Sequence, residues 1–166
     1  MQRKSFLFFD TIVSKVDAKG RVCIPAQYRA LFEQSDTELV AFRSFSKQCV
    51  ECCSSDLLEK FAADMEKSFA FFSEEQNTLA ELIYADAHAF CFDANGRIVL
   101  TDKLMKHARL TSEVAFVGKG RTFQIWNPEL YQKEQENIRQ KALKEHPSIL
   151  LRPQGAFLEN KESQNV

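Results

Sequence analysis

The strongest constraint on the fold of this chain is a pattern of nine residues that occurs twice. Asp-Ala-Lys-Gly-Arg-Val-Cys-Ile-Pro covers residues 17–25, and Asp-Ala-Asn-Gly-Arg-Ile-Val-Leu-Thr covers residues 93–101, 76 positions later. A short amphipathic stretch and then an apolar run follow each copy. Such a repeat indicates two copies of one supersecondary unit, neither of which is expected to bury its apolar face alone. Any surface built on the Asp-x-x-Gly-Arg segment is therefore presented twice per chain.

Each Asp-x-x-Gly-Arg segment predicts a tight turn between two short strands. In the first copy we expect strands at residues 11–16 and 21–24, paired as a hairpin. Asp at the first position and Gly at the fourth fit a type I turn whose next residue is left-handed. Gly20 and Gly96 meet that requirement, because glycine adopts positive φ without a steric penalty.

Alternation along the second strand of each turn separates apolar from charged side chains. Val22 and Ile24 share one face in the first copy, and Arg21 lies on the other. The second copy repeats this pattern, with Arg97 opposite the apolar face. We therefore expect both arginines to point away from the core.

Caps and breaks predict the elements that follow each turn. Short helices are expected from Pro25 to about Phe32 and, after a Thr101 or Asp102 cap, to about Leu110. Two strands are expected after each helix, at residues 38–43, 48–53, 113–118 and 122–126.

The segment between the repeats is predicted to be helical. Apolar residues recur at helical spacing from Leu57 onward, and Ser73 with Gln76 forms a capping box that starts a second helix. A further helix is expected from Asn127-Pro128 to residue 144 or 145. The predicted fold class is α+β. Its segments are a first repeat at residues 11–57, connecting helices at 58–86, a second repeat at 87–130, and a C-terminal helix and tail at 131–166.

Charge is segregated along the chain, although the net charge is only −1. Residues 54–92 contain two basic residues and eight acidic ones, which are Asp56, Glu59, Asp64, Glu66, Glu74, Glu75, Glu81 and Asp86. Both repeats are locally basic around their turns. The net charge therefore hides an asymmetry that favours a polyanionic partner for the repeats.

Composition excludes several classes of protein. With 45% hydrophobic and 27% charged residues, 166 residues suffice for a folded core. The N-terminal apolar run closes at Asp10 and is too short for a secretory signal, and no segment approaches membrane-spanning length. Five cysteines without framework spacing indicate a reducing cytoplasm. Several phenylalanines fall at core spacing and are expected to be buried, namely Phe61, Phe69, Phe72, Phe90 and Phe92.

No catalytic or metal site is expected. Cys49, Cys52 and Cys53 lack the second pair of ligands that a structural zinc site needs, so buried strand cysteines are favoured. The chain also lacks a serine–histidine–aspartate ordering and a phosphate-binding glycine loop. We therefore predict that it is not an enzyme and uses no cofactor, small-molecule substrate or membrane partner.

The repeated motif resembles the swapped-hairpin DNA-binding module of the AbrB type. Two such modules in one chain, joined by an acidic helical pair, are similar to the MraZ family of bacterial transcriptional regulators, which is linked to the division and cell-wall gene cluster. The matching segments are residues 17–29, 93–97, 117–118 and 123–126. The resemblance extends over about residues 7–130.

The resemblance implies a cytoplasmic regulator, associated with the nucleoid, in which the two repeats form one pseudo-symmetric β-barrel. Several chains would form a ring that presents the Asp-x-x-x-Arg segments to double-stranded DNA at promoter repeats. The implied function is sequence-specific repression of a division and cell-wall gene cluster that includes the protein's own promoter. The second copy departs from the first at two positions, with Thr101 in place of Pro25 and Asn95 in place of Lys19. Without the lysine the second copy is less basic at its turn, which puts equal roles of the two copies in question.

Two interpretations of Arg21 and Arg97 remain open. Asp17 and Asp93 lie four residues before them and can form salt bridges that only stabilise the turns. An exposed ion pair contributes under ~1 kcal/mol, however, so stability is a weak reason for the pattern to occur twice. We favour a role in which each carboxylate orients its arginine toward DNA, since guanidinium groups bind phosphates bidentately and read guanine edges.

Other basic residues of the first repeat are predicted to contact phosphates. Lys15, Lys19 and Arg29 are the candidates, with solvated surface residues as the alternative, while the two interpretations are balanced for Arg43 and Lys47. Two functions follow. The first is a DNA-binding transcriptional regulator, and the alternative is a ring-forming module on the same scaffold that binds a protein through the acidic helices. The basic turns favour the first.

Overall fold

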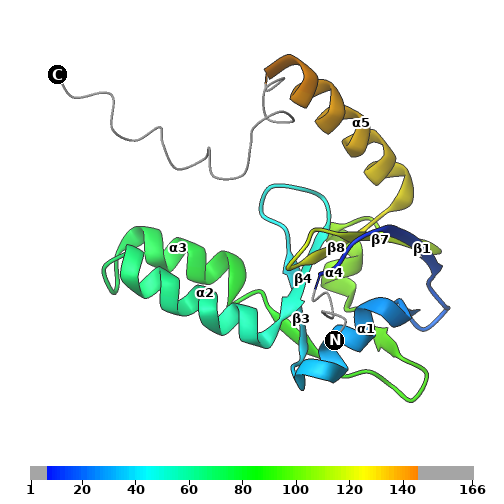
Figure 1. Cartoon of the computed structure of the whole chain (residues 1–166), viewed down its shortest axis with the longest axis horizontal. Coiled ribbons are helices and arrows are strands. Elements are labelled where there is room, and N and C mark those ends of the chain that lie inside the picture. Colours follow the sequence, from blue (N-terminus) through cyan, green and yellow to red (C-terminus); the bar gives the residue numbers. More distant parts are fainter. Residues whose placement is uncertain (1–6, 146–166) are drawn as a thin grey trace, which may run out of the picture. The chain divides into compact units, whose positions relative to one another are not determined.

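The computed structural model describes residues 7–145 (Figure 1). The strands are β1 (Thr11–Lys15), β2 (Arg21–Cys23), β3 (Leu39–Arg43), β4 (Val50–Ser54), β5 (His88–Phe90), β6 (Arg97–Val99), β7 (Glu113–Gly118) and β8 (Phe123–Trp126). The helices are α1 (Ala26–Ser35), α2 (Ser55–Ser68), α3 (Glu74–Ile83), α4 (Asp102–His107) and α5 (Pro128–Glu145). The α+β class is confirmed. Two compact units divide after Glu129, and the predicted tail after residue 145 lies outside the described residues.

The strands form two antiparallel sheets whose order is symmetric. Six strands follow the order β1-β7-β8-β4-β3-β5, and β2 and β6 form a separate two-stranded ribbon. Strands that are equivalent in the two repeats take mirrored places in the larger sheet, β1 with β5, β7 with β3, and β8 with β4. A closed barrel stays a prediction, because no ladder within residues 7–145 joins β1 to β5.

The hairpin predicted for residues 11–16 and 21–24 is wrong in its pairing. β1 pairs with β7, and β2 pairs with β6 of the other repeat. At the turn, β1 and β2 are joined by a bridge between Val16 and Val22. β2 leaves its own repeat because the exchange places Val22 opposite Ile98, where both side chains are buried. The two repeats thus share one core.

Aromatic residues from both repeats fill this core. Tyr28 of α1 and Phe123 of β8 are buried, and their ring centroids lie 5.0 Å apart. Tilted ring pairs of this kind contribute about 0.5–1.5 kcal/mol beyond the area they bury. The Tyr28 hydroxyl lies 3.0 Å from the carbonyl oxygens of both Phe9 and Asp10, which share its one proton. The same side chain therefore fills the core and holds the N-terminal segment.

The helix after the first turn differs from its predicted bounds. Pro25 precedes α1 instead of opening it, and its carbonyl accepts the N–H of Tyr28 at 2.9 Å. The helix continues past Phe32 to Ser35 and ends where Asp36 takes a left-handed conformation with φ 48°. This conformation ends the helix three residues beyond its predicted end near Phe32.

The other caps follow their predictions more closely. The Thr101 hydroxyl accepts the N–H of the third residue of α4, but α4 ends at His107 instead of near Leu110, and Arg109 is left-handed with φ 51°. At α5, the Asn127 side chain accepts the Glu129 N–H at 3.0 Å, which confirms this start. Of the helices within residues 7–145, none is long and apolar enough to cross a membrane.

The connecting segment forms the helical pair α2 and α3, which projects from the sheet (Figure 1). The Ser73 hydroxyl accepts the Gln76 N–H at 3.2 Å, as the capping box predicted. The Gln76 side chain accepts the N–H of Phe72 at 2.8 Å, not that of Ser73. The Gln76 side chain therefore binds the residue before the N-cap instead of the N-cap residue itself.

The five phenylalanines predicted to be buried differ in their exposure, and Phe69 is half-buried. Phe90 is buried and Phe92 packs against the core. The core prediction is wrong for Phe61, which is 38% exposed, and for Phe72, which is 97% exposed. Helical spacing shows which residues share a face, but it does not show whether another element covers that face.

Candidate nucleic-acid interface

The first turn, residues 17–21, is organised by one carboxylate. Asp17 Oδ1 accepts the backbone N–H groups of Lys19 and Arg21, both at 2.9 Å. Asp17 Oδ2 accepts Nε of the Arg21 guanidinium at 2.6 Å. Gly20 has φ 73° and donates its N–H to the Asp17 carbonyl at 3.0 Å, as the predicted turn requires. The aspartate therefore fixes the backbone and the arginine together.

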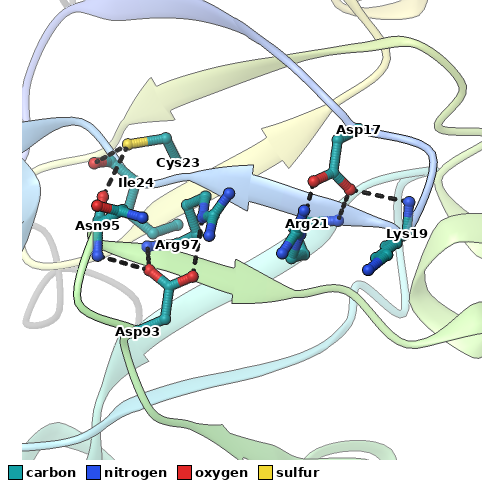
Figure 2. Close-up of polar contacts among 8 residues, drawn as sticks. All are labelled: Asp17, Lys19, Arg21, Cys23, Ile24, Asp93, Asn95 and Arg97. Atoms are coloured by element: carbon teal, nitrogen blue, oxygen red, sulfur yellow. Dashed lines mark hydrogen bonds and ion pairs between the residues drawn. The ribbon is translucent and has the colours of Figure 1, made fainter.

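The second turn, residues 93–97, has the same geometry. Asp93 Oδ1 accepts the N–H groups of Asn95 at 2.8 Å and Arg97 at 2.9 Å, and its Oδ2 accepts Arg97 Nε at 2.8 Å. Gly96 has φ 71°. Figure 2 shows the two Asp–Arg pairs at opposite ends of the β2–β6 ribbon. The sequence repeat is therefore a repeat of the hydrogen-bond pattern.

The ribbon directs both arginines to its open face. Arg21 lies opposite Val99 and Arg97 lies opposite Cys23, while the central pair, Val22 and Ile98, is buried. The arginine side chains are about one third exposed, at 32% and 30%. Among the hydrogen bonds of the described residues, each guanidinium uses its Nε, so its two terminal amino groups are available to a ligand.

Both carboxylates are held in the charged form. The pKa of Asp17 lies below its ordinary value of 3.8, chiefly because the Arg21 backbone N–H donates to it, and the Arg21 side chain and the Lys19 N–H add to the effect. The Asp93 pKa is lowered in the same way, chiefly by the Arg97 backbone N–H. Each arginine is therefore oriented by a carboxylate that is ionised at neutral pH.

Of the other predicted DNA contacts, Lys19 lies at the first turn, and Lys15 and Arg29 lie elsewhere. Lys19 is exposed within that turn. Lys15 is exposed on β1, in the larger sheet, with Glu113 as its neighbour across the ladder. Arg29 packs on the second turn, because a Cβ added to Gly96 would overlap the Arg29 guanidinium. Arg29 belongs to the first repeat in sequence, but the strand exchange places its guanidinium on the turn of the second repeat.

One polar cluster is not apparent from the sequence, because its members lie in three separate segments. Asp86 is 7% exposed and accepts Nη2 of Arg43 at 2.8 Å and Nζ of Lys103 at 2.6 Å. Burial raises the pKa of Asp86, but the side-chain hydrogen bonds from Arg43 and Lys103, with the backbone N–H and the charge of Arg43, hold that pKa well below its usual range. Asp86, one of the eight acidic residues of the segment 54–92, is therefore held in an ion-pair cluster, and Arg43 is engaged in an ion pair within the chain.

The fold and the site together define a class of protein with two repeats that exchange strands and present matched Asp–Arg turns on a shared ribbon. A family model described as "MraZ protein, putative antitoxin-like" matches residues 83–151. A protein named transcriptional regulator MraZ from Pelagibacter ubique is 39% identical over 137 residues, which are 82% of this chain and 88% of that protein. One of the same name from Gluconobacter oxydans is 40% identical over 140 residues, 82% of this chain and 85% of its own. This chain belongs to the MraZ family.

Proposed function

We propose that this chain is a sequence-specific DNA-binding transcriptional regulator in the cytoplasm. Arg21 and Arg97 are its base- or phosphate-reading residues, and Lys15, Lys19 and Arg29 contact phosphates. The proposal extends to repression of a division and cell-wall gene cluster that includes its own promoter. Relatives in Pelagibacter ubique and Gluconobacter oxydans bear the name transcriptional regulator, which supports the role in transcription.

The observation that carries the proposal is the matched orientation of the two arginines. In each turn the aspartate binds Nε, and the two terminal amino groups of the guanidinium make no hydrogen bond among the described residues. Such a group binds phosphate or the O6 and N7 acceptors of guanine through two parallel hydrogen bonds. A two-stranded ribbon also fits the major groove. An exposed pair that served only stability would contribute under ~1 kcal/mol at each turn.

Arg21→Ala tests the proposal directly. With DNA from the region upstream of the protein's own gene, we expect a loss of about 1–3 kcal/mol of binding free energy per engaged chain. If Arg21 contacts phosphate alone, the salt slope should also fall by ~0.9. Arg139→Ala, an exposed arginine of α5, is the control and should bind as the parent does. Parent-like binding by Arg21→Ala with a lower melting temperature would instead assign Arg21 a structural role.

Assembly into a ring is part of the proposal. Exposed apolar residues lie along the N-terminal segment and the edge strand β1, with Phe9 62% and Val13 56% exposed. Apolar residues on an unpaired strand edge favour contact with another chain. Closed rings arise when one surface of a subunit binds a different surface of its neighbour. Light scattering that shows a monomer at all concentrations would refute this part.

The protein-interaction alternative has one observation in its favour. A groove of about 520 Å³ opens between the larger sheet and the α2–α3 pair, with an apolar lining that includes Phe42, Leu57, Phe61 and Ile83. A partner bound there would leave the basic turns without a role. Retention on immobilised DNA distinguishes the two functions, because the alternative predicts no salt-dependent, sequence-selective retention.

A further inference from the structure

Arg29 occupies a place that its sequence position does not suggest. The residue belongs to α1 of the first repeat, yet its guanidinium packs directly on Gly96 of the second turn. The equivalent residue of the second repeat, 76 positions later, is Met105. Its sulfur lies 3.7 Å from where a Cβ of Gly20 would stand, over the first turn. Each turn is thus covered by a side chain from the other repeat.

The turn that contains a lysine is covered by a neutral side chain, and the turn that lacks one is covered by an arginine. The first turn carries Lys19 and is covered by the neutral Met105, whereas the second carries the neutral Asn95 and is covered by Arg29. Each turn therefore has one cation besides its own Asp–Arg pair. The loss of basicity at the second turn, which the sequence repeat predicted, is compensated through the strand exchange.

The surroundings of Arg29 leave its charge without a counter-ion. Within residues 7–145, its side chain makes no ion pair or hydrogen bond, and its Nε is buried without a partner. Arg21 and Arg97, by contrast, each have an aspartate. Burying part of a guanidinium without a carboxylate is unfavourable, and an anion on the terminal amino groups would offset the cost. A phosphate group suits those amino groups in both charge and geometry.

We propose that Arg29 and the Asp93–Arg97 turn form one composite site for a DNA phosphate, with Arg29 taking the part that Lys19 has at the first turn. This inference rests on the proposed DNA-binding function. It names the residue that gives the second turn the same positive charge as the first. Gly96 is part of the same site. Its hydrogen is what lets the guanidinium lie on the turn, so a Cβ there would displace Arg29.

The test uses the full chain and a mixed-sequence DNA duplex, titrated over a range of salt concentrations. We expect Arg29→Met, which copies Met105, to bind about threefold to tenfold more weakly, and its salt slope to fall by ~0.9 per engaged chain. Arg29→Lys should keep the slope. Arg29→Gln is a second neutral variant, for use if Arg29→Met does not fold.

A pair of glycine variants assigns the effect to the second turn. Gly20→Ala and Gly96→Ala carry the same positive-φ strain, but only Gly96→Ala displaces Arg29. Gly96→Ala should therefore lower the slope as Arg29→Met does, and should lower it no further when combined with Arg29→Met. Gly20→Ala strains the first turn to the same degree but leaves Arg29 in place, so it should lower the slope less than Gly96→Ala does.

The outcomes distinguish failure of the composite site from failure of the proposed DNA-binding function. A parent-like slope in Arg29→Met, in a series where Arg21→Ala weakens binding, overturns the composite site and leaves the DNA-binding function standing. Equal slopes in the two glycine variants overturn it too. A parent chain that shows no salt-dependent binding to DNA refutes both proposals.

Discussion

At the scale of single residues, aspartate is the side chain that makes each turn possible. Its carboxylate is short enough to reach the N–H groups two and four residues ahead while its second oxygen holds a guanidinium. Five hydrogen bonds therefore depend on residues within a five-residue segment at the first turn, namely three to the Asp17 carboxylate, one from Gly20 N–H to Asp17 O and one from Asp17 N–H to Arg21 O. Because all of these hydrogen bonds join residues of the same short segment, the turn can be predicted from the sequence.

The lowered pKa values of Asp17 and Asp93 predict a pH dependence. Because the folded-state pKa lies below the ordinary value of 3.8, the carboxylates stabilise the folded chain above that pH. The stabilisation is lost as the pH falls through the lowered pKa. Asp17→Asn should therefore melt below the parent at pH 7, and the difference in melting temperature should shrink as the pH falls below 4. A difference that is constant from pH 7 to pH 3 would contradict this explanation.

At the scale of elements, the turn between α2 and α3 contains an unfavourable residue. Phe72 has φ 64° and a side chain that is 97% exposed. A left-handed conformation costs an L-residue about 1–2 kcal/mol, and asparagine tolerates it better than phenylalanine. The only apolar neighbour in ring contact with it is Phe71, at 6.3 Å between centroids, among the described residues.

Phe72→Asn is therefore expected to stabilise the chain. The gain should be about 0.5–1 kcal/mol, measured as a higher midpoint in urea, since the N–H of residue 72 can still donate to Gln76. Phe71→Asn is the matched control, because Phe71 is exposed but does not have positive φ. A gain of the same size in both variants would mean that loss of exposed apolar surface, not backbone strain, is responsible.

At the scale of the whole molecule, the shared core and one polar cluster hold the two repeats together. Arg43 lies on β3 of the first repeat and Lys103 on α4 of the second, and Asp86 of the connecting segment binds both. Asp86 also accepts the backbone N–H of Arg43 at 2.8 Å. Such a cluster joins three parts of the chain that lie far apart in sequence.

Replacing Asp86 should therefore destabilise the fold. Asp86→Asn leaves two cations without their counter-ion, and we expect it to lower the free energy of unfolding by about 1–3 kcal/mol. The effect is below that of a fully buried pair because Arg43 and Lys103 are about half exposed and screened by solvent. Asp64→Asn makes the same chemical change on the exposed face of α2 and should cost under ~0.5 kcal/mol. If urea denaturation gives the same loss of free energy of unfolding for Asp86→Asn and Asp64→Asn, the cluster has no structural role.

The sequence by itself determined the features that depend on neighbours along the chain. The geometry of the two turns, the caps at Thr101 and Ser73, and the burial of Val22 and Ile24 all follow from contacts within about five residues or from strand alternation. Local hydrogen bonds of this kind close small loops at little cost in chain entropy, so the residues that make them stand close together in the sequence.

Only the tertiary structure decided which strand pairs with β2 and which turn Arg29 covers. The pairing of Val22 with Ile98, the overlap of Arg29 with Gly96 and the binding of Asp86 by Lys103 join residues that lie far apart in the chain. A hairpin and an exchanged strand satisfy the same alternation, and the exchange is selected because it buries the apolar faces of both repeats in one core. The exposure of Phe72 has the same origin, since coverage of a helical face depends on the elements that pack around it and not on spacing along the helix.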